Sequence, residues 1–222
     1  VLKKAGYRTA VAGKWHLSDD PIPYGFDTNF GGLRWGAPKS YFSPYRNPKL
    51  KDGPKGEHLP ARLATDLCHW IRNAEEKSER FFVYFPFYSV HTPIQARADL
   101  TARYNGKSGT HHSNAKYAAM LEAMDLAVGQ ILDLLDELKL ASNTLVVFTS
   151  DNGPHGGVSN ARPLRGSKGM FYEGGIREPF LDPRMTIGEA PKHAAMQIVL
   201  LLILAPIAAT QRGEFSGLMI PV

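Results

Sequence analysis

The sequence has a single cysteine, Cys68, among its 222 residues. No disulfide can form within the chain, so cysteine usage leaves the redox compartment undetermined. Cys68 is followed by His69 and Trp70 on an expected amphipathic helix. A lone cysteine in that setting most often serves as a small buried hydrophobe. We therefore assign Cys68 to packing.

The chain also lacks a block of charge of one sign. Its 26 Lys and Arg alternate with 21 Asp and Glu, which leaves a formal net charge of +5. We therefore do not expect it to bind nucleic acid. The excess positive charge could instead serve an anionic small molecule, because fixed cations in a cleft raise the local concentration of anions. The composition does not indicate an oligomeric state.

One long apolar run is present, at residues 194–209, and it contains Pro206. It is shorter than the roughly 20 residues that a membrane-spanning helix needs, so we do not expect a membrane span. The run resembles a secretory signal, which is out of place so far from the N-terminus. We interpret residues 182–222 as an aberrant tail, from a frameshift, a misassembled gene or an expression artefact. A buried strand or helix is the alternative.

Three expected strands, each followed by a polar loop, have helices between them. The strands are residues 8–12, 81–87 and 145–149, and the second is a continuous apolar run that suits a strand buried on both faces of a sheet. Apolar residues at helical spacing predict helices over 63–71 and 117–138. Residues 21–60 are rich in Gly, Pro and aromatic residues and predict an irregular excursion. This order predicts an α/β fold, whose ligands gather at the carboxyl ends of strands.

The loop after the first expected strand reads G-K-W-H-L at residues 13–17. In extended backbone, Lys14 and His16 point roughly the same way and can reach one anionic group. The alternative is an ordinary surface lysine beside a structural histidine.

The loop after the second expected strand contains His91, within S-V-H-T-P at residues 89–93. Histidine can donate or accept a proton near neutral pH. The alternative is a histidine that hydrogen-bonds a turn before Pro93.

The third expected strand ends at Asp151 and Asn152, which Gly153 follows. A carboxylate beside an amide offers hard oxygen ligands of the kind that Ca²⁺ or Mg²⁺ prefers. The alternative is a turn in which both side chains cap their own backbone.

Lys168 lies in R-G-S-K-G at residues 165–169, and Y-E-G-G-I-R follows at residues 172–177. Glycines on both sides let the backbone approach a ligand, while Lys168 supplies a positive charge for an oxyanion. The alternative is a flexible basic loop.

Taken in order, these motifs resemble the sulfatase family of the alkaline-phosphatase-like superfamily. Residues 6–18 resemble G-Y-x-T-x-x-x-G-K-W-H-L-G, with Ser18 in place of the final glycine, and residues 24–27 resemble the G-F-D segment that follows it. Residues 82–96 resemble the family's strand and H-T-P loop, residues 117–153 its Y-A-A-M and F-T-S-D-N-G segment, and residues 163–177 its P-L-R-G-x-K and Y-E-G-G-I-R segment. The resemblance covers residues 1 to about 180 and implies an incomplete mixed, mostly parallel sheet flanked by helices.

The resemblance also implies roles for individual residues. Lys14 would bind a sulfate oxygen, and His16 would hydrogen-bond the hydroxyl of the nucleophile. The substrate-binding residues would be Lys14, Lys168 and His91, with His91 near the ester oxygen. His91 would protonate the leaving group, a task that Lys168 shares. Asp151 and Asn152 would be two ligands of Ca²⁺, or of Mg²⁺. Positive charge around the sulfuryl oxygens and an acid for the departing alkoxide are what sulfate-ester cleavage requires.

The sequence departs from the family at the nucleophile. The family makes a formylglycine from Cys or Ser in C-x-P-x-R, and no such motif occurs in residues 1–222. The family's pair of metal-binding aspartates is also missing. We therefore expect a fragment with a partial catalytic domain at residues 1–181, an aberrant tail at 182–222, and no activity of this chain alone.

Two other functions stay open at this stage. A phosphodiesterase or phosphonate monoester hydrolase of the same superfamily would share the metal site, and a non-catalytic fragment would bind an anion weakly or not at all. By resemblance the substrate is a sulfate ester, with a sulfated carbohydrate as a family-level expectation. Export to the periplasm or cell exterior, or delivery to the lysosome, is expected in the same way.

Overall fold

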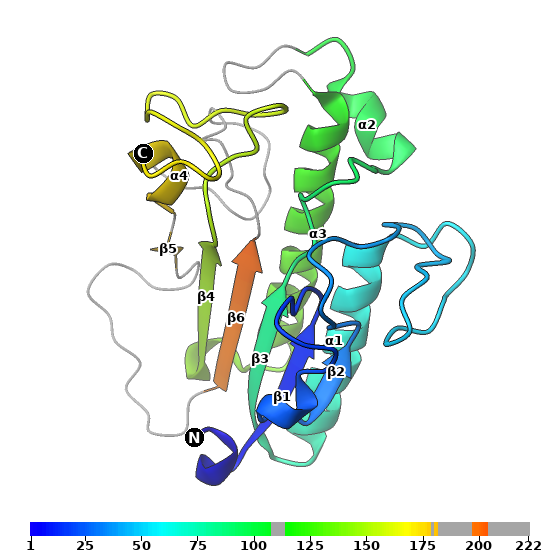
Figure 1. Cartoon of the computed structure of the whole chain (residues 1–222). Coiled ribbons are helices and arrows are strands. Elements are labelled where there is room, and N and C mark those ends of the chain that lie inside the picture. The colour runs from blue at the N-terminus through cyan, green and yellow to red at the C-terminus, as the bar shows by residue number, and fades with distance from the viewer. Residues whose placement is uncertain (108–113, 179, 182–196, 204–222) are drawn as a thin grey trace.

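A computed structural model describes residues 1–107, 114–178, 180–181 and 197–203 (Figure 1). Its helices are η1 (Lys3–Ala5), η2 (Ile22–Tyr24), α1 (Leu59–Glu76), α2 (Ala98–Tyr104), α3 (Ala115–Glu137), η3 (Ala141–Asn143) and α4 (Glu173–Ile176). Its strands are β1 (Tyr7–Ala12), β2 (Thr28–Phe30), β3 (Arg80–Pro86), β4 (Thr144–Ser150), β5 (Phe180–Leu181) and β6 (Gln197–Ile203).

The strands of the described part form one sheet in the order β2-β1-β3-β6-β4-β5. Every neighbouring pair is parallel except β4 with β5. The mostly parallel α/β sheet predicted from the sequence is therefore confirmed. Because β1, β3 and β4 run in the same direction, their carboxyl ends lie along one edge of the sheet, and the loops that follow them can meet there.

Helices α1 and α3 pack against each other and lie behind the sheet in Figure 1. The predicted apolar residues of α1, among them Leu63, Leu67 and Ile71, are buried in the core. Cys68 is buried on the same helix, and burial raises the pKa of its thiol to about 11. The assignment of Cys68 to packing fits this environment. Helix α3 begins where the Asn114 side chain accepts a hydrogen bond from the Tyr117 N–H (3.1 Å), which satisfies a free donor of the first turn.

The prediction that β3 is buried on both faces is wrong for this structure. Phe81, Val83 and Phe85 are buried, whereas Phe82 and Tyr84 between them are only partly buried. Alternation of this kind means that one face packs on the helices and the other is less covered. On the less covered face, aromatic side chains from a loop partly cover the strand.

These aromatic side chains belong to a cluster centred on Phe26. Its ring stacks on Phe82 and Tyr84, with ring centroids 6.1 and 6.4 Å away. Trp15 meets Phe26 and Tyr24 edge-on, at 5.7 and 5.4 Å. Offset and edge-on arrangements are the favourable geometries for aromatic pairs. The cluster thus anchors the loop after β1 to the outer face of β3.

The region at residues 21–60 is more ordered than the sequence predicted. It contains η2 and the short strand β2, which pairs with β1 from Ala10↔Thr28 to Ala12↔Phe30. The expected packing through aromatics is present, since Tyr41 and Tyr45 are fully buried. A strand of three residues carries too little periodicity to be recognised before its partner is known.

The expectation that the tail lies outside the sheet is wrong for Gln197–Ile203, which forms β6 between β3 and β4 (Figure 1). Its backbone pairs with Phe82–Pro86 on one side and with Thr144–Ser150 on the other. A run of Ile, Val and Leu suits a central parallel strand, which was the alternative considered for this segment. The domain boundary at residues 181/182 stays a prediction. Among the described helices, none is long and apolar enough to cross a membrane.

Candidate functional site

Lys14 is held at the carboxyl end of β1 by a close contact between two strands. The Gly13 N–H donates to the Phe30 carbonyl (2.9 Å), and the Lys14 N–H donates to the Pro86 carbonyl (2.8 Å). A side chain at residue 13 would put its Cβ 2.2 Å from the Pro86 oxygen, and Gly13 has a φ of +103°. Only glycine therefore allows the loop to turn this close to β3.

Lys14 itself is buried, although it carries a cationic side chain. Burial lowers the pKa of its ammonium group, the nearby positive charge of Lys168 lowers it further, and the negative charge of Asp151 raises it. A buried lysine with a carboxylate beside it is a common arrangement at sites that bind or transform charged ligands.

His91 follows β3 in a loop pinned by Tyr41. The Tyr41 hydroxyl donates to the carbonyls of Tyr88 (2.6 Å) and His91 (2.9 Å). His91 Nδ1 lies 3.1 Å from the Thr92 carbonyl oxygen, which can only accept, so we assign the hydrogen to Nδ1. Nε2 is then the ring nitrogen that can exchange a proton with a ligand.

The pKa of His91 is lowered, mainly because the ring is partly buried. The Thr92 carbonyl raises it by accepting the ring hydrogen. Lys168 and Lys14 lower the pKa by charge repulsion, and Asp151 raises it. Three charged side chains from two other loops therefore influence the pKa of the imidazole.

Asp151 and Asn152 lie directly after β4. The pKa of Asp151 is raised by the protein around it, although one side of the carboxylate is open to solvent. Lys14, Lys168 and the Asn152 side chain act in the opposite direction. The Asn152 Oδ1 atom is buried and has no hydrogen-bond partner among the described residues. An unsatisfied buried oxygen of this kind calls for a partner that the described residues do not supply.

Lys168 is positioned by a compact loop between β4 and α4. Its N–H donates to the Pro154 carbonyl (2.9 Å), and the Gly153 N–H donates to the Gly175 carbonyl (3.0 Å). A Cβ on Gly153 would lie 2.0 Å from the Gly174 oxygen, so two glycine-containing segments touch backbone to backbone. These contacts give the loop a compact backbone, and the choice between an anion-binding loop and a flexible basic loop stays a prediction.

The structure brings four of the six predicted residues within range of one another's charges. Lys14, His91, Asp151 and Lys168 come from three loops at one edge of the sheet. The charges of Lys14, Asp151 and Lys168 all act on the pKa of His91, and Lys14 and Asp151 act on each other. Asn152 belongs with them through its hydrogen bond to Asp151. The individual roles predicted for these residues remain predictions.

His16 is placed differently. It is exposed, adopts a φ of +62°, and its N–H donates to the Leu33 carbonyl (3.0 Å). Its ring lies against Gly36, where an added Cβ would come within 2.8 Å of Nε2. The described contacts of His16 are thus with the loop at residues 33–36, and its predicted bond to a nucleophile stays untested.

Glu178 was not singled out in the sequence and lies beside the site. Both carboxylate oxygens are buried, and burial raises the pKa of the group, while the Ser150 hydroxyl lowers it and Asp151 raises it. Glu178 directly follows the Y-E-G-G-I-R segment. Glu178 was missed because the recognised motif covers only residues 172–177.

The described residues supply only part of a metal site. They contain no group of three or more His, Cys, Asp or Glu that could hold a metal ion. The open carboxylate of Asp151 and the unsatisfied Oδ1 of Asn152 are nevertheless hard oxygen ligands of the type that Ca²⁺ takes. The donor chemistry fits calcium, and the number of donors falls short of the six to eight that calcium prefers.

Comparison with known proteins agrees with the motifs. The sequence model of the family described as Sulfatase matches residues 1–182. A protein of Formosa agariphila described as "Sulfatase" is 39% identical over 146 residues, which are 61% of this chain and 26% of that protein. Human N-acetylgalactosamine-6-sulfatase is 34% identical over 211 residues, 82% of this chain and 38% of the relative.

A solved structure has the same fold over most of the chain. The crystal structure described as "Ps i-CgsB in complex with k-i-k-neocarrahexaose" superposes with a TM-score of 0.72 and 27% identity, over 92% of this chain and 49% of that one. The chain therefore spans about half or less of the length of each of these proteins.

Proposed function

Because the chain belongs to the sulfatase family, we propose that it supplies the sulfate-binding part of a sulfuric ester hydrolase site. The observation that carries the proposal is that the loops after β1, β3 and β4 bring Lys14, His91, Asp151 and Lys168 to one edge of the sheet, where the charges of Lys168, Lys14 and Asp151 act on the pKa of His91. Two fixed cations and an imidazole on one edge of a sheet suit a small tetrahedral anion.

In this proposal, the two lysines bind the sulfuryl oxygens. Lys14 is buried and fixed by β3, whereas Lys168 is half-buried on its glycine-rich loop. Cations held in position by the fold stabilise the charge that develops on the sulfuryl group without having to reorganise during the reaction.

His91 would act as the general acid. When the bond between sulfur and the ester oxygen breaks, the departing alkoxide needs a proton, and Nε2 of a protonated His91 can supply it. Partial burial and two nearby lysines lower the pKa of His91, so its imidazolium is a stronger acid than a free one. Lys168 would share this task, as the family resemblance implies.

Asp151 and Asn152 would hold a calcium ion together with ligands from outside the described residues. When bound, the ion would supply further positive charge to the sulfate group. The Asn152 Oδ1 atom supports this assignment because it is buried and has no hydrogen-bond partner in the described part of the chain.

A sulfated carbohydrate is the proposed class of substrate. The family includes N-acetylgalactosamine-6-sulfatases among its relatives, and one structural neighbour carries a neocarrahexaose. The first name refers to a sulfated amino sugar and the second to an oligosaccharide. Both names therefore support a carbohydrate leaving group here. We propose export or lysosomal delivery on the same family grounds.

The proposal is tested by the binding of inorganic sulfate to the purified chain, measured by calorimetry. Lys168→Met should weaken binding about tenfold or more, which corresponds to about 1.4 kcal/mol. Lys55→Met is the matched control, because Lys55 is an exposed lysine on a distant loop and its loss changes the net charge equally. Equal effects of the two substitutions would contradict the proposal. Tighter binding of methylphosphonate than of sulfate would favour the phosphonate hydrolase alternative.

A further inference from the structure

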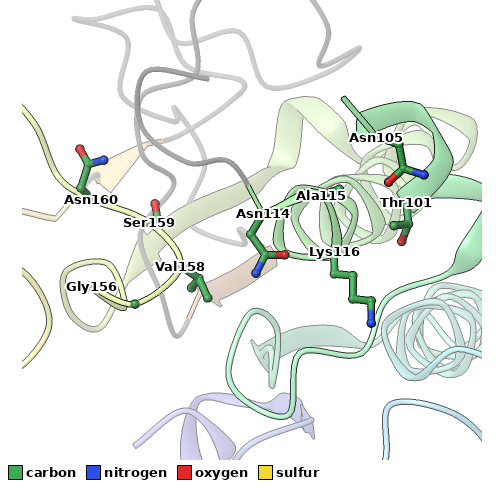
Figure 2. Close-up of a pocket in the computed structure, with 10 residues that line it drawn as sticks. Thr101, Asn105, Asn114, Ala115, Lys116, Gly156, Val158, Ser159 and Asn160 are labelled. Carbon is green, nitrogen blue, oxygen red and sulfur yellow. The ribbon is translucent and has the colours of Figure 1, made fainter. Parts of the chain in front are cut away.

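A polar hollow of about 680 Å³ opens at the same end of the sheet as the candidate site (Figure 1). One wall comes from the end of α2 and the start of α3, where Asn105, Asn114 and Lys116 lie (Figure 2). The other wall is the loop at residues 156–160. In Figure 1 both walls lie at the end of the sheet toward which β3 and β4 point. The volume is in the range of pockets that bind small organic ligands, roughly 300–1,000 Å³.

The loop wall is continuous with the candidate site. Only residues 152–155 separate Asp151 from Gly156, so their Cα atoms lie at most about 18 Å apart. An added Cβ on Gly156 would be 3.2 Å from Ser167 Oγ, and Ser167 immediately precedes Lys168. A ligand several sugar units long could therefore reach from Lys168 into the hollow.

The loop wall is also held in a fixed shape. The N–H groups of Val158 and Ser159 both donate to the His155 carbonyl, at 3.0 Å each. The Val158 side chain packs against the main hydrophobic core, and Ser159 is buried. A wall that is ordered before binding avoids much of the entropy cost of arranging it around a ligand.

The chemistry of the lining points to a hydroxyl-rich anion. The described lining residues include three asparagines, two hydroxyl side chains and one lysine, and no carboxylate. Asn114 Oδ1 accepts the Tyr117 N–H, so the amide hydrogens are the part of this side chain that can donate to a ligand. Lys116 is exposed, and Figure 2 shows its side chain beside that of Asn114. Amides suit sugar hydroxyls, and the ammonium group suits a sulfate.

We propose that this hollow binds a second sugar unit of a sulfated oligosaccharide, with Lys116 paired to a sulfate group on that unit. The sulfate ester to be cleaved would lie at Lys14 and Lys168, and the glycan would extend past Gly156 into the hollow. This inference rests on the proposed function and adds a requirement for an oligosaccharide with more than one sulfate.

The test compares two kinds of ligand on the purified chain. Calorimetry with inorganic sulfate reports on the Lys168 site through the part of the binding that Lys168→Met removes. Calorimetry with sulfated hexasaccharides prepared from carrageenan and from chondroitin sulfate reports on both sites. At least one hexasaccharide should bind tenfold or more tightly than inorganic sulfate.

Variants then locate the additional affinity. Lys116→Gln and Asn105→Ala should each weaken hexasaccharide binding, by about tenfold for the lysine, and should leave the affinity for inorganic sulfate unchanged. Lys55→Gln is the control for net charge. After chemical desulfation of the hexasaccharide, Lys116→Gln should have no effect.

The outcomes separate this inference from the function on which it rests. If inorganic sulfate binds in a Lys168-dependent way but no hexasaccharide binds more tightly, or if Lys116→Gln and Asn105→Ala change nothing, the hollow is not a sugar subsite and the proposed function stands. If inorganic sulfate binding does not depend on Lys168, the proposed function fails first.

Discussion

Lys14 and Asp151 influence each other's charge across two intervening strands of the sheet. Lys14 follows β1 and Asp151 follows β4, with β3 and β6 between them. The carboxylate raises the pKa of the lysine, and the lysine lowers the pKa of the carboxylate. These two residues of opposite charge are far apart in sequence, yet their charges interact. The loops at the carboxyl edge of the sheet therefore share one electrostatic environment.

We expect the chain to show no measurable hydrolysis of an aryl sulfate such as 4-methylumbelliferyl sulfate. Binding groups without a nucleophile leave the covalent route closed, and residues 1–222 contain no C-x-P-x-R motif. The measurement is fluorescence release over many hours at high protein concentration. Turnover that is abolished by His91→Ala would show that a nucleophile is present in another form.

Calcium should bind only weakly, with a dissociation constant of about 1 mM or higher, on the order of the weakest protein sites. Asp151 and Asn152 offer two ligands, whereas the ion prefers six to eight. Calorimetry measures the affinity, and Asp151→Asn should weaken it further.

The control for calcium binding is Asp133→Asn, since Asp133 is an exposed carboxylate on α3. It removes the same charge from the last turns of α3, outside the loop that carries Asp151, and should leave calcium affinity unchanged. Micromolar binding to the unmodified chain would mean that further ligands come from residues not identified above.

Gly153→Ala should destabilise the chain by about 1–3 kcal/mol, the usual cost of overpacking. The new Cβ would lie 2.0 Å from the Gly174 oxygen and 2.6 Å from the Gly175 Cα, and both are backbone atoms that must move. Because Lys168 is on the same loop, sulfate affinity should fall as well. Thermal unfolding and calorimetry measure the two effects.

Gly129→Ala is the matched control for this substitution. Gly129 lies inside α3, and an added Cβ there would meet nothing within 4 Å. Replacing glycine by alanine in a helix interior should stabilise the chain by up to about 1 kcal/mol. Equal destabilisation by both substitutions would exclude the backbone contact as the cause.

His58 should make the fold sensitive to acid. Its ring is buried against Tyr41 and Phe42, and burial lowers its pKa to about 4; Arg97 lowers it too, and Asp99 raises it. The unfolded chain protonates this histidine near its ordinary pKa of about 6.5. Between these values the unfolded state binds more protons, so stability is full above pH 6.5 and declines as the pH falls toward 4.

His58→Phe should therefore reduce the slope of unfolding free energy against pH in that window, by at most about 1.4 kcal/mol per pH unit. Denaturant unfolding at several pH values measures the slope. At pH 7.5 the histidine is neutral in both states, so the difference there reports packing alone. An unchanged slope in the variant would mean that other groups cause the acid sensitivity.

Ending the chain at residue 196 should cause aggregation. It removes β6 and leaves β3 and β4 without the partner that satisfies their backbone groups. A chain that ends at residue 203 keeps β6 and is the matched control. Sedimentation and circular dichroism compare the two. If the shorter chain stays soluble with unchanged helical content, pairing with β6 does not contribute to the stability of the sheet.

The sequence was informative where residue type and strand direction act together. Lys14, His91 and Asp151 each follow an expected strand, and the family resemblance joined them into one site. Parallel strands bring their carboxyl ends to one edge, which agrees with that grouping. The helix 117–138 was predicted almost to its ends from its apolar stripe. Long helices with a regular apolar pattern, and polar loops that follow strands, can therefore be predicted from the sequence.

Other features depend on tertiary contacts that a sequence does not display. Strand β2 forms because β1 offers a free edge beside it, and β6 because a gap lies between β3 and β4. The position of Glu178 beside Ser150 follows from the chain folding back through α4. Each is set by a partner far away in sequence, which local propensity cannot identify.

The aromatic cluster around Phe26 includes one of the tryptophans, and all tryptophan fluorescence of the molecule comes from one part of the chain. All three tryptophans, Trp15, Trp35 and Trp70, precede β3 in sequence. Trp15 directly follows Lys14 and packs on the cluster, so its emission should respond when an anion reaches that lysine. Emission from the chain is thus a signal from the β1 and α1 side, whereas the β4 side, with Asp151 and Lys168, contributes no indole. Unfolding curves from tryptophan emission and from circular dichroism will coincide only if both sides of the sheet come apart together.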